Sequence, residues 1–301
     1  MTGYTRSNVT DAEQDMPFST STIGAQTTSE QHTTDARWLM AYAGSLGDMN
    51  PLYMDTTQEI YAHPVFPVCL EWPSILATRQ LAGAGGLTDY EASKGVHASH
   101  DLHIYRNIRP DETLRTHARI IDVQKIRPGA ACIMQIDTVD SEDRLVCRTY
   151  QTSIYRGVGV NHDQANSGEA APPLPSQVSD FEVDNVISIP VPAHLAHTYT
   201  ECAHIWNPIH TDRAVALAAG LPDIILHGTA TLALAVSALV DHQLGGDAGR
   251  VSRLGGRFAA MVLMPSDIEL QIGKANRGTI GFRVLNAQGQ EAISQGFLSY
   301  Q

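Results

Sequence analysis

The segment Leu46-Gly-Asp-Met-Asn-Pro-Leu-Tyr-Met-Asp55 recurs in the chain as Ala203-His-Ile-Trp-Asn-Pro-Ile-His-Thr-Asp212, at an offset of 157 residues. Only the Asn, the Pro and the final Asp are identical, but the surroundings of the two segments agree. Each is followed by a short helical pattern, an apolar helix and alternating strand-like runs, and Pro110 and Pro265 recur at an offset of 155. The repeat therefore predicts two copies of one fold.

The composition changes between the two copies. Residues 161–177 are rich in small, polar and proline residues, which is typical of an exposed linker. We therefore place the first copy at residues 18–160 and the second at 178–301. Residues 1–17 are polar and are expected to form a flexible tail.

Each copy is expected to contain a central helix. In the second copy this helix begins near Gly228 and runs to residue 240; it is apolar on nearly every side, so it must be surrounded by protein. The first copy has a shorter, less apolar counterpart near residues 72–81. Asp212 is expected to cap a short helix over residues 214–219, and Asp55 is expected to be a helix cap in the first copy.

Alternating apolar and polar residues predict several antiparallel strands after each helix. The expected ranges are 103–106, 114–123, 131–139 and 145–155 in the first copy, and 256–262, 268–272, 279–285 and 291–300 in the second. The fold class is then α+β, with one helix wrapped by a sheet in each copy. Packing the two sheets edge to edge would bury strands that an isolated sheet exposes.

Charge and composition exclude several functions. The chain has 301 residues with a formal net charge of −12, which disfavours binding to nucleic acid and to anionic membranes. Its longest apolar stretch has thirteen residues, short of the roughly 20 that span a bilayer. The four cysteines form no C-x-x-C pair and the N-terminus lacks the apolar run of a secretory signal, so a cytoplasmic protein is expected.

Gly47-Asp-Met-Asn-Pro-Leu-Tyr53 and Trp206-Asn-Pro-Ile-His210, with Leu226-His-Gly228 downstream, resemble the Gly-Asp-x-Asn-Pro-Leu/Ile-His signature of MaoC-like hot-dog proteins. That family includes (R)-specific enoyl-CoA hydratases and acyl-thioester dehydratases. The resemblance covers residues 20–157 and 178–301 and implies a tandem, or double, hot-dog fold. It further implies reversible hydration or dehydration of an acyl thioester without a metal or redox cofactor. CoA or a carrier pantetheine would enter as part of the substrate.

In the family, the Asp and the His of one motif hold a water and add it across a conjugated double bond, which is general acid–base chemistry. Neither copy has both residues. The first copy keeps Asp48 but has Tyr53 where the His belongs, and the second keeps His210 but has Ile205 where the Asp belongs.

Three hypotheses follow from the incomplete motifs. In the first, the second copy is active, with His210 as acid/base and Asn207 orienting substrate or water. In the second, Asp48 is the base and Tyr53 the acid, although a phenol with a pKa of about 10 is a slow acid. In the third, both copies are non-catalytic and the chain binds a thioester or a protein partner.

A thioester carbonyl also needs charge stabilisation when an enolate forms, and the free N–H groups of a helix N-terminus supply it. Gly228, which has no side chain to block approach, is suited to this role. The matching place in the first copy is predicted at Leu70-Glu71-Trp72-Pro73, where a carboxylate would repel the enolate. A thioesterase remains a rival, with Asp48 or Glu71 activating water against the carbonyl.

Two further groups of polar residues are candidate binding sites. In a regular strand, His97, Asp101 and His103 would point one way and His100 the other, so no metal site is expected there. Four arginines near strand starts could bind the phosphates of CoA or of a pantetheine arm, or could be solvated strand-end charges: Arg106, Arg109, Arg253 and Arg257. The sequence leaves open whether the chain forms a homo-oligomer.

Overall fold

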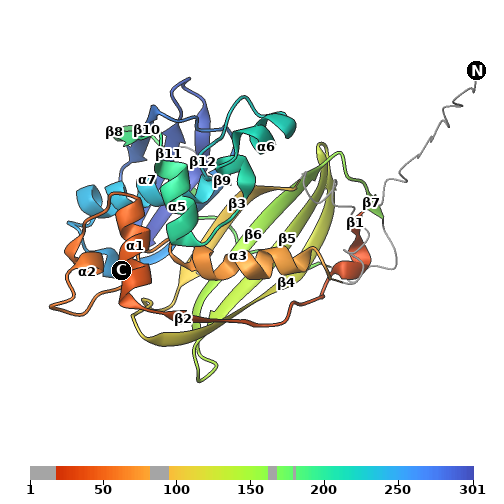
Figure 1. Ribbon diagram of the computed structural model, residues 1–301, viewed down its shortest axis with the longest axis horizontal. Helices are drawn as coiled ribbons and strands as arrows, with labels where there is room; N and C mark the ends of the chain where they lie inside the picture. The colour runs from red at the N-terminus through yellow and green to blue at the C-terminus, as the bar shows by residue number, and fades with distance from the viewer. Residues whose placement is uncertain (1–17, 82–94, 162–167, 179–180) are drawn as a thin grey trace, which may run out of the picture.

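The computed structural model describes residues 18–81, 95–161, 168–178 and 181–301, and its main element is a ten-stranded antiparallel sheet (Figure 1). The strands, in chain order, are β2 (Glu30–Thr34), β3 (Gly95–Ile104), β4 (Glu112–Ile126), β5 (Gly129–Val139), β6 (Leu145–Arg156), β8 (Val183–Val191), β9 (Val251–Phe258), β10 (Ser266–Gly273), β11 (Thr279–Leu285) and β12 (Glu291–Tyr300). Two short strands, β1 (Phe18–Ser19) and β7 (Val160–Asn161), pair separately.

The strand order of the second copy is the reverse of the strand order of the first copy, about the junction between them. It runs β2-β4-β5-β6-β3 in the first copy and β9-β12-β11-β10-β8 in the second, and β3 and β9 pair at the junction. His100 lies opposite Gly256 and Leu102 opposite Leu254 in that antiparallel pair. The predicted edge-to-edge arrangement of two copies is therefore confirmed, and each copy keeps only one outer edge strand.

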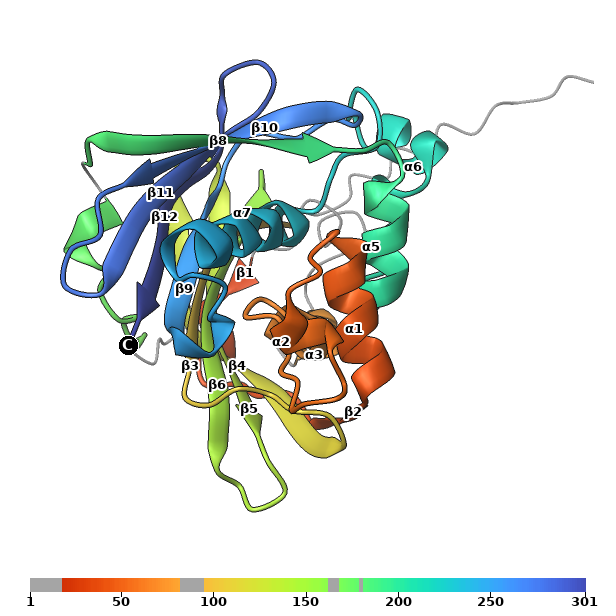
Figure 2. The same ribbon diagram turned by 90° about the vertical axis from the view of Figure 1, so that its left-hand side faces the viewer.

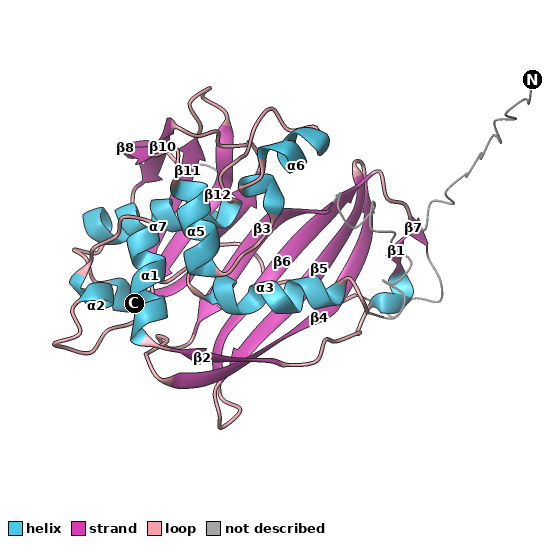
Figure 3. Cartoon of the chain, in the orientation of Figure 1, coloured by secondary structure: helices cyan, strands magenta, loops and turns pink. Residues whose placement is uncertain are grey.

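The helices lie on one face of the sheet (Figures 2 and 3). The central helices are α3 (Pro67–Thr78) and α7 (Gly228–Gln243). Two further helices, α1 (Ala36–Ser45) and α5 (Leu195–Ala203), pack against each other between the copies. One continuous hydrophobic core joins buried residues of both copies, including eight buried residues of α7.

The predicted start of α7 at Gly228 is confirmed, but the first central helix begins earlier than predicted. It starts at Pro67, whose fixed φ suits the first helical position, and Pro73 lies inside it. The strands β11 and β12 match their predicted ranges. β2, β8, α1 and α5 lie outside the predicted elements; β2 is polar, and β8 is an outer edge strand that is mostly exposed.

The two predicted caps have different outcomes. Asp212 caps α6 (Arg213–Ala218), accepting hydrogen bonds from the backbone N–H groups of Ala214 and Val215, as predicted. Asp55 is a cap at the C-terminal end of α2 (Pro51–Met54), where its backbone N–H donates to the Pro51 carbonyl. Its carboxylate accepts hydrogen bonds from Thr57, which closes a turn instead of starting a helix.

The predicted tail, residues 1–17, lies outside the described residues. In the part of the predicted linker that the structure describes, Glu169 pairs with Arg119 of β4 and the carbonyl of Pro173 accepts a hydrogen bond from Arg253 of β9. This segment therefore contacts both copies. No helix among the described residues is long and apolar enough to span a membrane.

Candidate active site

His210 ends a single helical turn, η3 (Pro208–His210), whose start is capped by Asn207. The Asn207 side-chain oxygen accepts a hydrogen bond from the N–H of Ile209 at 3.4 Å. The Nδ1 atom of His210 lies 2.8 Å from the carbonyl oxygen of Ile225. Because a carbonyl only accepts, Nδ1 must carry the proton, and Nε2 keeps a lone pair. The turn thus holds His210 in the tautomer of a general base, with Asn207 as its positioning residue.

A second imidazole lies against His210. The ring of His227 stacks on it with centroids 3.7 Å apart, and Nε2 of His227 lies 3.1 Å from the hydroxyl of Thr200. Burial lowers the pKa of His210 to about 4, against the opposing effect of its hydrogen bond to Ile225. Burial, and then the neighbouring His210, lower the pKa of His227. Both rings are therefore neutral at neutral pH.

Gly228 is the first residue of α7 and follows His227 directly. The first N–H groups of a helix have no partner within it and carry the positive end of its dipole. A Cβ atom added at Gly228 would come within 3.0 Å of the Phe258 ring, so a side chain has no room there. The structure therefore brings together the three residues predicted for the second copy, with His227 as a neighbour whose role the sequence left open.

The matching region of the first copy is filled by an imidazole. His63 lies with Nε2 3.9 Å from Oδ2 of Asp48 and with its ring centroid 5.4 Å from that of Tyr53. Its Nδ1 accepts from the N–H of Val65, and its Nε2 lies 3.1 Å from the hydroxyl of Ser237 on α7. All donors and acceptors of this ring are thus engaged inside the protein.

The pKa values of Tyr53 and His63 disfavour acid–base catalysis in the first copy. Burial, and then the Asp48 carboxylate, raise the pKa of Tyr53 well above its usual value. Burial lowers the pKa of His63 to about 4, against the attraction of Asp48. A phenol with a raised pKa is a poor acid near neutral pH, so the hypothesis that pairs Asp48 with Tyr53 loses support.

The predicted helix start of the first copy also needs correction. Because α3 begins at Pro67, the residues that match His227-Gly228 are Phe66 and Pro67, and Glu71 lies one turn inside the helix. Proline has no N–H to donate, so the first copy offers a weaker oxyanion site than the second. Glu71 is buried and accepts a hydrogen bond from the Thr149 hydroxyl.

The predicted strand geometry of the histidine run is wrong. A bulge between His97 and Ser99 shifts the register of β3 by one residue. His97 and His100 consequently contact each other, with ring centroids 5.4 Å apart, while Asp101 and His103 form a separate pair at 3.3 Å. Within the described ranges, no group of three metal-ligating side chains comes together.

Three of the four candidate arginines are held by carboxylates. Arg106 pairs with Glu112 and Asp140, Arg109 with Glu59, and Arg253 with Asp101. Arg257 is exposed and has no carboxylate partner among the residues that the structure describes.

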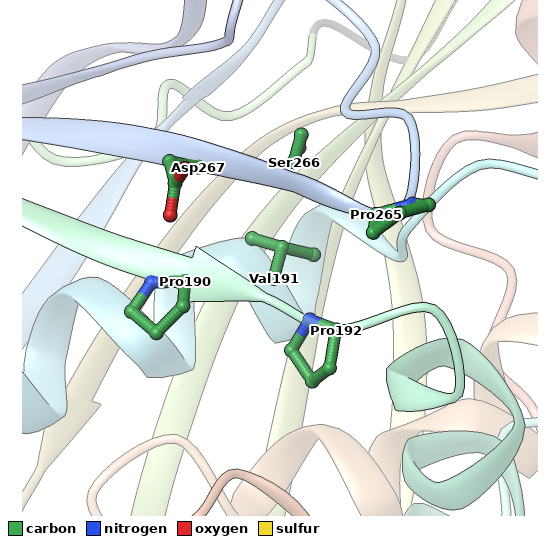
Figure 4. A pocket seen from close by; sticks show the side chains of 6 residues that line it. All are labelled: Pro190, Val191, Pro192, Pro265, Ser266 and Asp267. Carbon is green, nitrogen blue, oxygen red and sulfur yellow. The ribbon is translucent and has the colours of Figure 1, made fainter.

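A pocket also lies at the outer edge of the sheet (Figure 4). It is lined by β8, the start of β10 and the residues beside them: Pro190, Val191, Pro192, Pro265, Ser266 and Asp267. It contains no histidine and none of the predicted site residues. It offers no acid–base pair.

Comparison with known families gives one match in each half of the chain. The family described as "MaoC like domain" matches residues 176–295, and the family described as "FAS1-like, dehydratase domain region" matches residues 21–149. The enoyl-CoA hydratase ChsH3 of Mycobacterium tuberculosis is 27% identical over 254 residues, covering 83% of this chain and 82% of that protein. The 3-hydroxyacyl-thioester dehydratase Y of the same organism is 25% identical, covering 95% and 99%.

Solved structures share the fold at lower identity. A MaoC-like dehydratase from Phytophthora capsici superposes with a TM-score of 0.80 at 21% identity, covering 92% of this chain and 95% of that one. The full-length peroxisomal multifunctional enzyme type 2 of Drosophila melanogaster gives 0.74 at 22% identity, covering 92% and 48%. A Mycobacterium tuberculosis protein described as having a double hot-dog fold gives 0.60 at 16% identity, covering 92% and 95%. The predicted double hot-dog fold is confirmed.

Proposed function

The second half of the chain belongs to the MaoC-like family and the first half matches a FAS1-like dehydratase region, and from this premise we propose that the chain reversibly hydrates or dehydrates an acyl thioester at the second copy, with His210 as acid/base. The relatives named enoyl-CoA hydratase and 3-hydroxyacyl-thioester dehydratase support this class of reaction. CoA or a carrier pantetheine would be the thiol part of the substrate.

The observation that carries the proposal is the unprotonated Nε2 of a neutral His210 whose ring stacks on His227, the residue before α7. In the hydration direction, this nitrogen removes a proton from water while the water oxygen bonds to the β-carbon. The electrons of the double bond move to the thioester oxygen, and the N–H groups at Gly228 stabilise the enolate. Protonation of the α-carbon then completes the addition.

The α-carbon must receive a proton from a group in this motif. Because Ile205 stands where the family has a carboxylate, the imidazolium formed at His210 is the proton donor. It gives the α-carbon the proton that it took from water. No proton is released overall. One residue then performs both transfers, while Asn207 holds the turn and the Ile225 carbonyl fixes the tautomer.

A panel of enoyl-CoA and 3-hydroxyacyl-CoA substrates tests the proposal through the conjugated enoyl chromophore and through free thiol. We expect His210→Ala to lower kcat at least about 100-fold, the usual size of an acid–base contribution. Asp48→Asn should change kcat less than about threefold. Full turnover by His210→Ala overturns the assignment, and loss of turnover in Asp48→Asn alone moves the site to the first copy. Thiol release without a change in the chromophore indicates a thioesterase, and binding without turnover indicates a non-catalytic subunit.

A further inference from the structure

His227 is a buried imidazole at the proposed site that takes no part in the proton transfers described above. It is 2% exposed and lies face to face with His210, with ring centroids 3.7 Å apart and an angle of 26° between the ring planes. Stacked rings turn their faces to each other and not their nitrogen atoms, so no hydrogen bond joins the two imidazoles. Any effect of His227 on His210 must therefore act through its aromatic face.

The ring of His227 is held in place by side chains of α5. Its Nε2 lies 3.1 Å from the hydroxyl oxygen of Thr200, which is itself buried. The Tyr199 ring packs against it at a tilt, with centroids 5.0 Å apart, and the Tyr199 hydroxyl donates to Thr229 near the start of α7. These contacts fix the plane of the His227 ring and, through the stacking, the plane of His210.

No charged side chain in the described part of the chain shifts the pKa of His210 or of His227. The carboxylate of the family motif is replaced by Ile205, which is 5% exposed. Burial raises the pKa of Tyr199, so this titratable neighbour of the pair is uncharged as well. The proposed reaction nevertheless requires an imidazolium at His210, so an uncharged group has to stabilise it.

A neutral aromatic ring is able to stabilise a cation. A cation above the face of such a ring is attracted by the electrons of that face, most strongly where water is excluded. The partner ring must then stay neutral itself. Burial and then His210 lower the pKa of His227, against the effect of the Ile205 carbonyl, so His227 remains neutral when His210 takes up a proton. The stacked pair is thus suited to hold one proton, on His210.

We propose that His227 is a positioning residue for His210: its neutral ring fixes the plane of the catalytic imidazole and stabilises the imidazolium by stacking, in place of the missing carboxylate. This inference rests on the proposed reaction at the second copy, and it names a second residue on which the proton transfers depend. His227 forms no bond to the substrate in this role.

Side chains with and without an aromatic face test the inference. Thr200→Ala makes room at Nε2, and in that background His227→Phe keeps a flat ring whereas His227→Leu removes it. The fold accepts a phenyl ring at the matching place of the first copy, where Phe66 precedes α3. We expect the phenyl variant to have a kcat about tenfold higher than the leucine variant, with equal KM. Equal kcat values in two variants with matched urea midpoints overturn the inference.

A second test leaves both imidazoles in place. Thr200→Val removes the hydroxyl that holds His227, whereas Thr200→Ser keeps it. We expect Thr200→Val to lower kcat about three- to tenfold and Thr200→Ser to retain the wild-type kcat. Thr198→Val is the matched control on α5, because the Thr198 hydroxyl donates to the His194 carbonyl instead of contacting the pair. Unchanged kcat in Thr200→Val contradicts a role for the orientation of His227.

Proton uptake by the substrate-free protein separates this inference from the proposed reaction. Nitrogen-15 shifts of the His210 ring, followed from about pH 7.5 to about 4.5, measure its protonated fraction. The leucine variant should bind this proton about tenfold more weakly than the phenyl variant, and Thr198→Val should follow the wild type. If the wild type converts no thioester but this difference is found, the reaction is wrong and the stacked pair stands. If thioesters are converted while proton affinity and kcat are equal in the phenyl and leucine variants, the reaction stands and His227 only fills space.

Discussion

Tyr42 and Tyr199 occupy equivalent positions in the two copies, 157 residues apart, and their hydroxyl oxygens lie 3.4 Å from each other. Both side chains are fully buried, on the paired helices α1 and α5. A contact between two equivalent residues marks the point where the pseudo-twofold axis of the tandem passes. The Tyr199 hydroxyl also donates to Thr229, the second residue of α7, which links this axis to the start of the proposed catalytic helix.

The two tyrosines should differ in their contribution to stability. Tyr199→Phe removes the donor of Thr229 and leaves the buried Tyr42 hydroxyl without its partner, so we expect a loss of about 1–3 kcal/mol in the free energy of unfolding. Tyr42→Phe keeps the bond from Tyr199 to Thr229 and should cost less than about 1 kcal/mol. Urea unfolding monitored by fluorescence measures both variants. Equal losses would mean that the hydrogen bond to Thr229 contributes nothing.

The repeat predicted the double fold because its signals are local. The apolar run of α7 and the alternation in β11 and β12 are visible in single windows of sequence. The equivalence of Tyr42 and Tyr199 has the same offset as the motif, and extending the comparison beyond ten residues would have found it. The strand β2, Glu30–Thr34, carries no apolar alternation, so only its place beside β4 identifies it.

The candidate active site could be predicted only in part, because some of its residues lie outside the motifs. His210, Asn207 and Gly228 were found because they belong to a motif, but their neighbours come from elsewhere in the fold. His63 enters the first motif from a loop outside it, and no spacing rule connects it to Asp48. The contact between His97 and His100 depends on a β-bulge, which adds one residue and reverses the expected alternation. Such contacts follow from packing and cannot be derived from periodicity.

The pH dependence of turnover should follow His210. Its imidazole must be neutral to accept a proton, and its pKa is lowered to about 4 by burial. In the hydration direction, kcat/KM of the free enzyme should therefore be constant on the acidic side of neutrality and fall only as the pH drops toward about 4. An unperturbed histidine would give this limb at about 6.5. Stopped-flow assays at short times, before acid unfolding, measure the profile, and a limb near 6.5 would contradict the assignment.

A side chain at Gly228 should impair activity through the start of α7. The Cβ of Gly228→Ala would lie 3.0 Å from the Phe258 ring, so the ring or the helix start must move. Because the N–H groups stabilise an oxyanion only when they are correctly placed, we expect kcat to fall about 10- to 100-fold. Overpacking should also lower the free energy of unfolding by about 1–3 kcal/mol.

Gly44→Ala is the matched control for that substitution. It lies in α1, and its Cβ would meet only the end of the Met54 side chain at 3.5 Å. Alanine in a helix interior is favoured over glycine by roughly 0.5–1 kcal/mol, so this variant should unfold at equal or higher urea concentration with unchanged kcat. If both alanines leave kcat unchanged, the helix start does not contact the thioester.

Buried histidines should make the fold sensitive to mild acid. Burial lowers the pKa of His63 and of His100 to about 4, and that of His97 well below its usual value. In the unfolded chain the pKa is about 6.5, so between the two values the unfolded state binds more protons. Stability is then full above about pH 6.5 and declines as the pH falls toward 4. Each histidine with a folded pKa of about 4 removes about 3 kcal/mol by that pH.

Glu71 acts in the opposite direction, which gives the experiment an internal comparison. Its pKa is raised to about 7 by burial, so its contribution is present at acidic pH and is lost as the pH rises through about 7. Urea midpoints at several pH values from 7.5 down to 5 should show His100→Phe losing less stability than the wild type on acidification, and Glu71→Gln gaining relative to the wild type as the pH rises. His242→Gln, at an exposed position, should follow the wild type throughout. Parallel curves for all four proteins would show that the buried imidazole and carboxyl groups do not control acid stability.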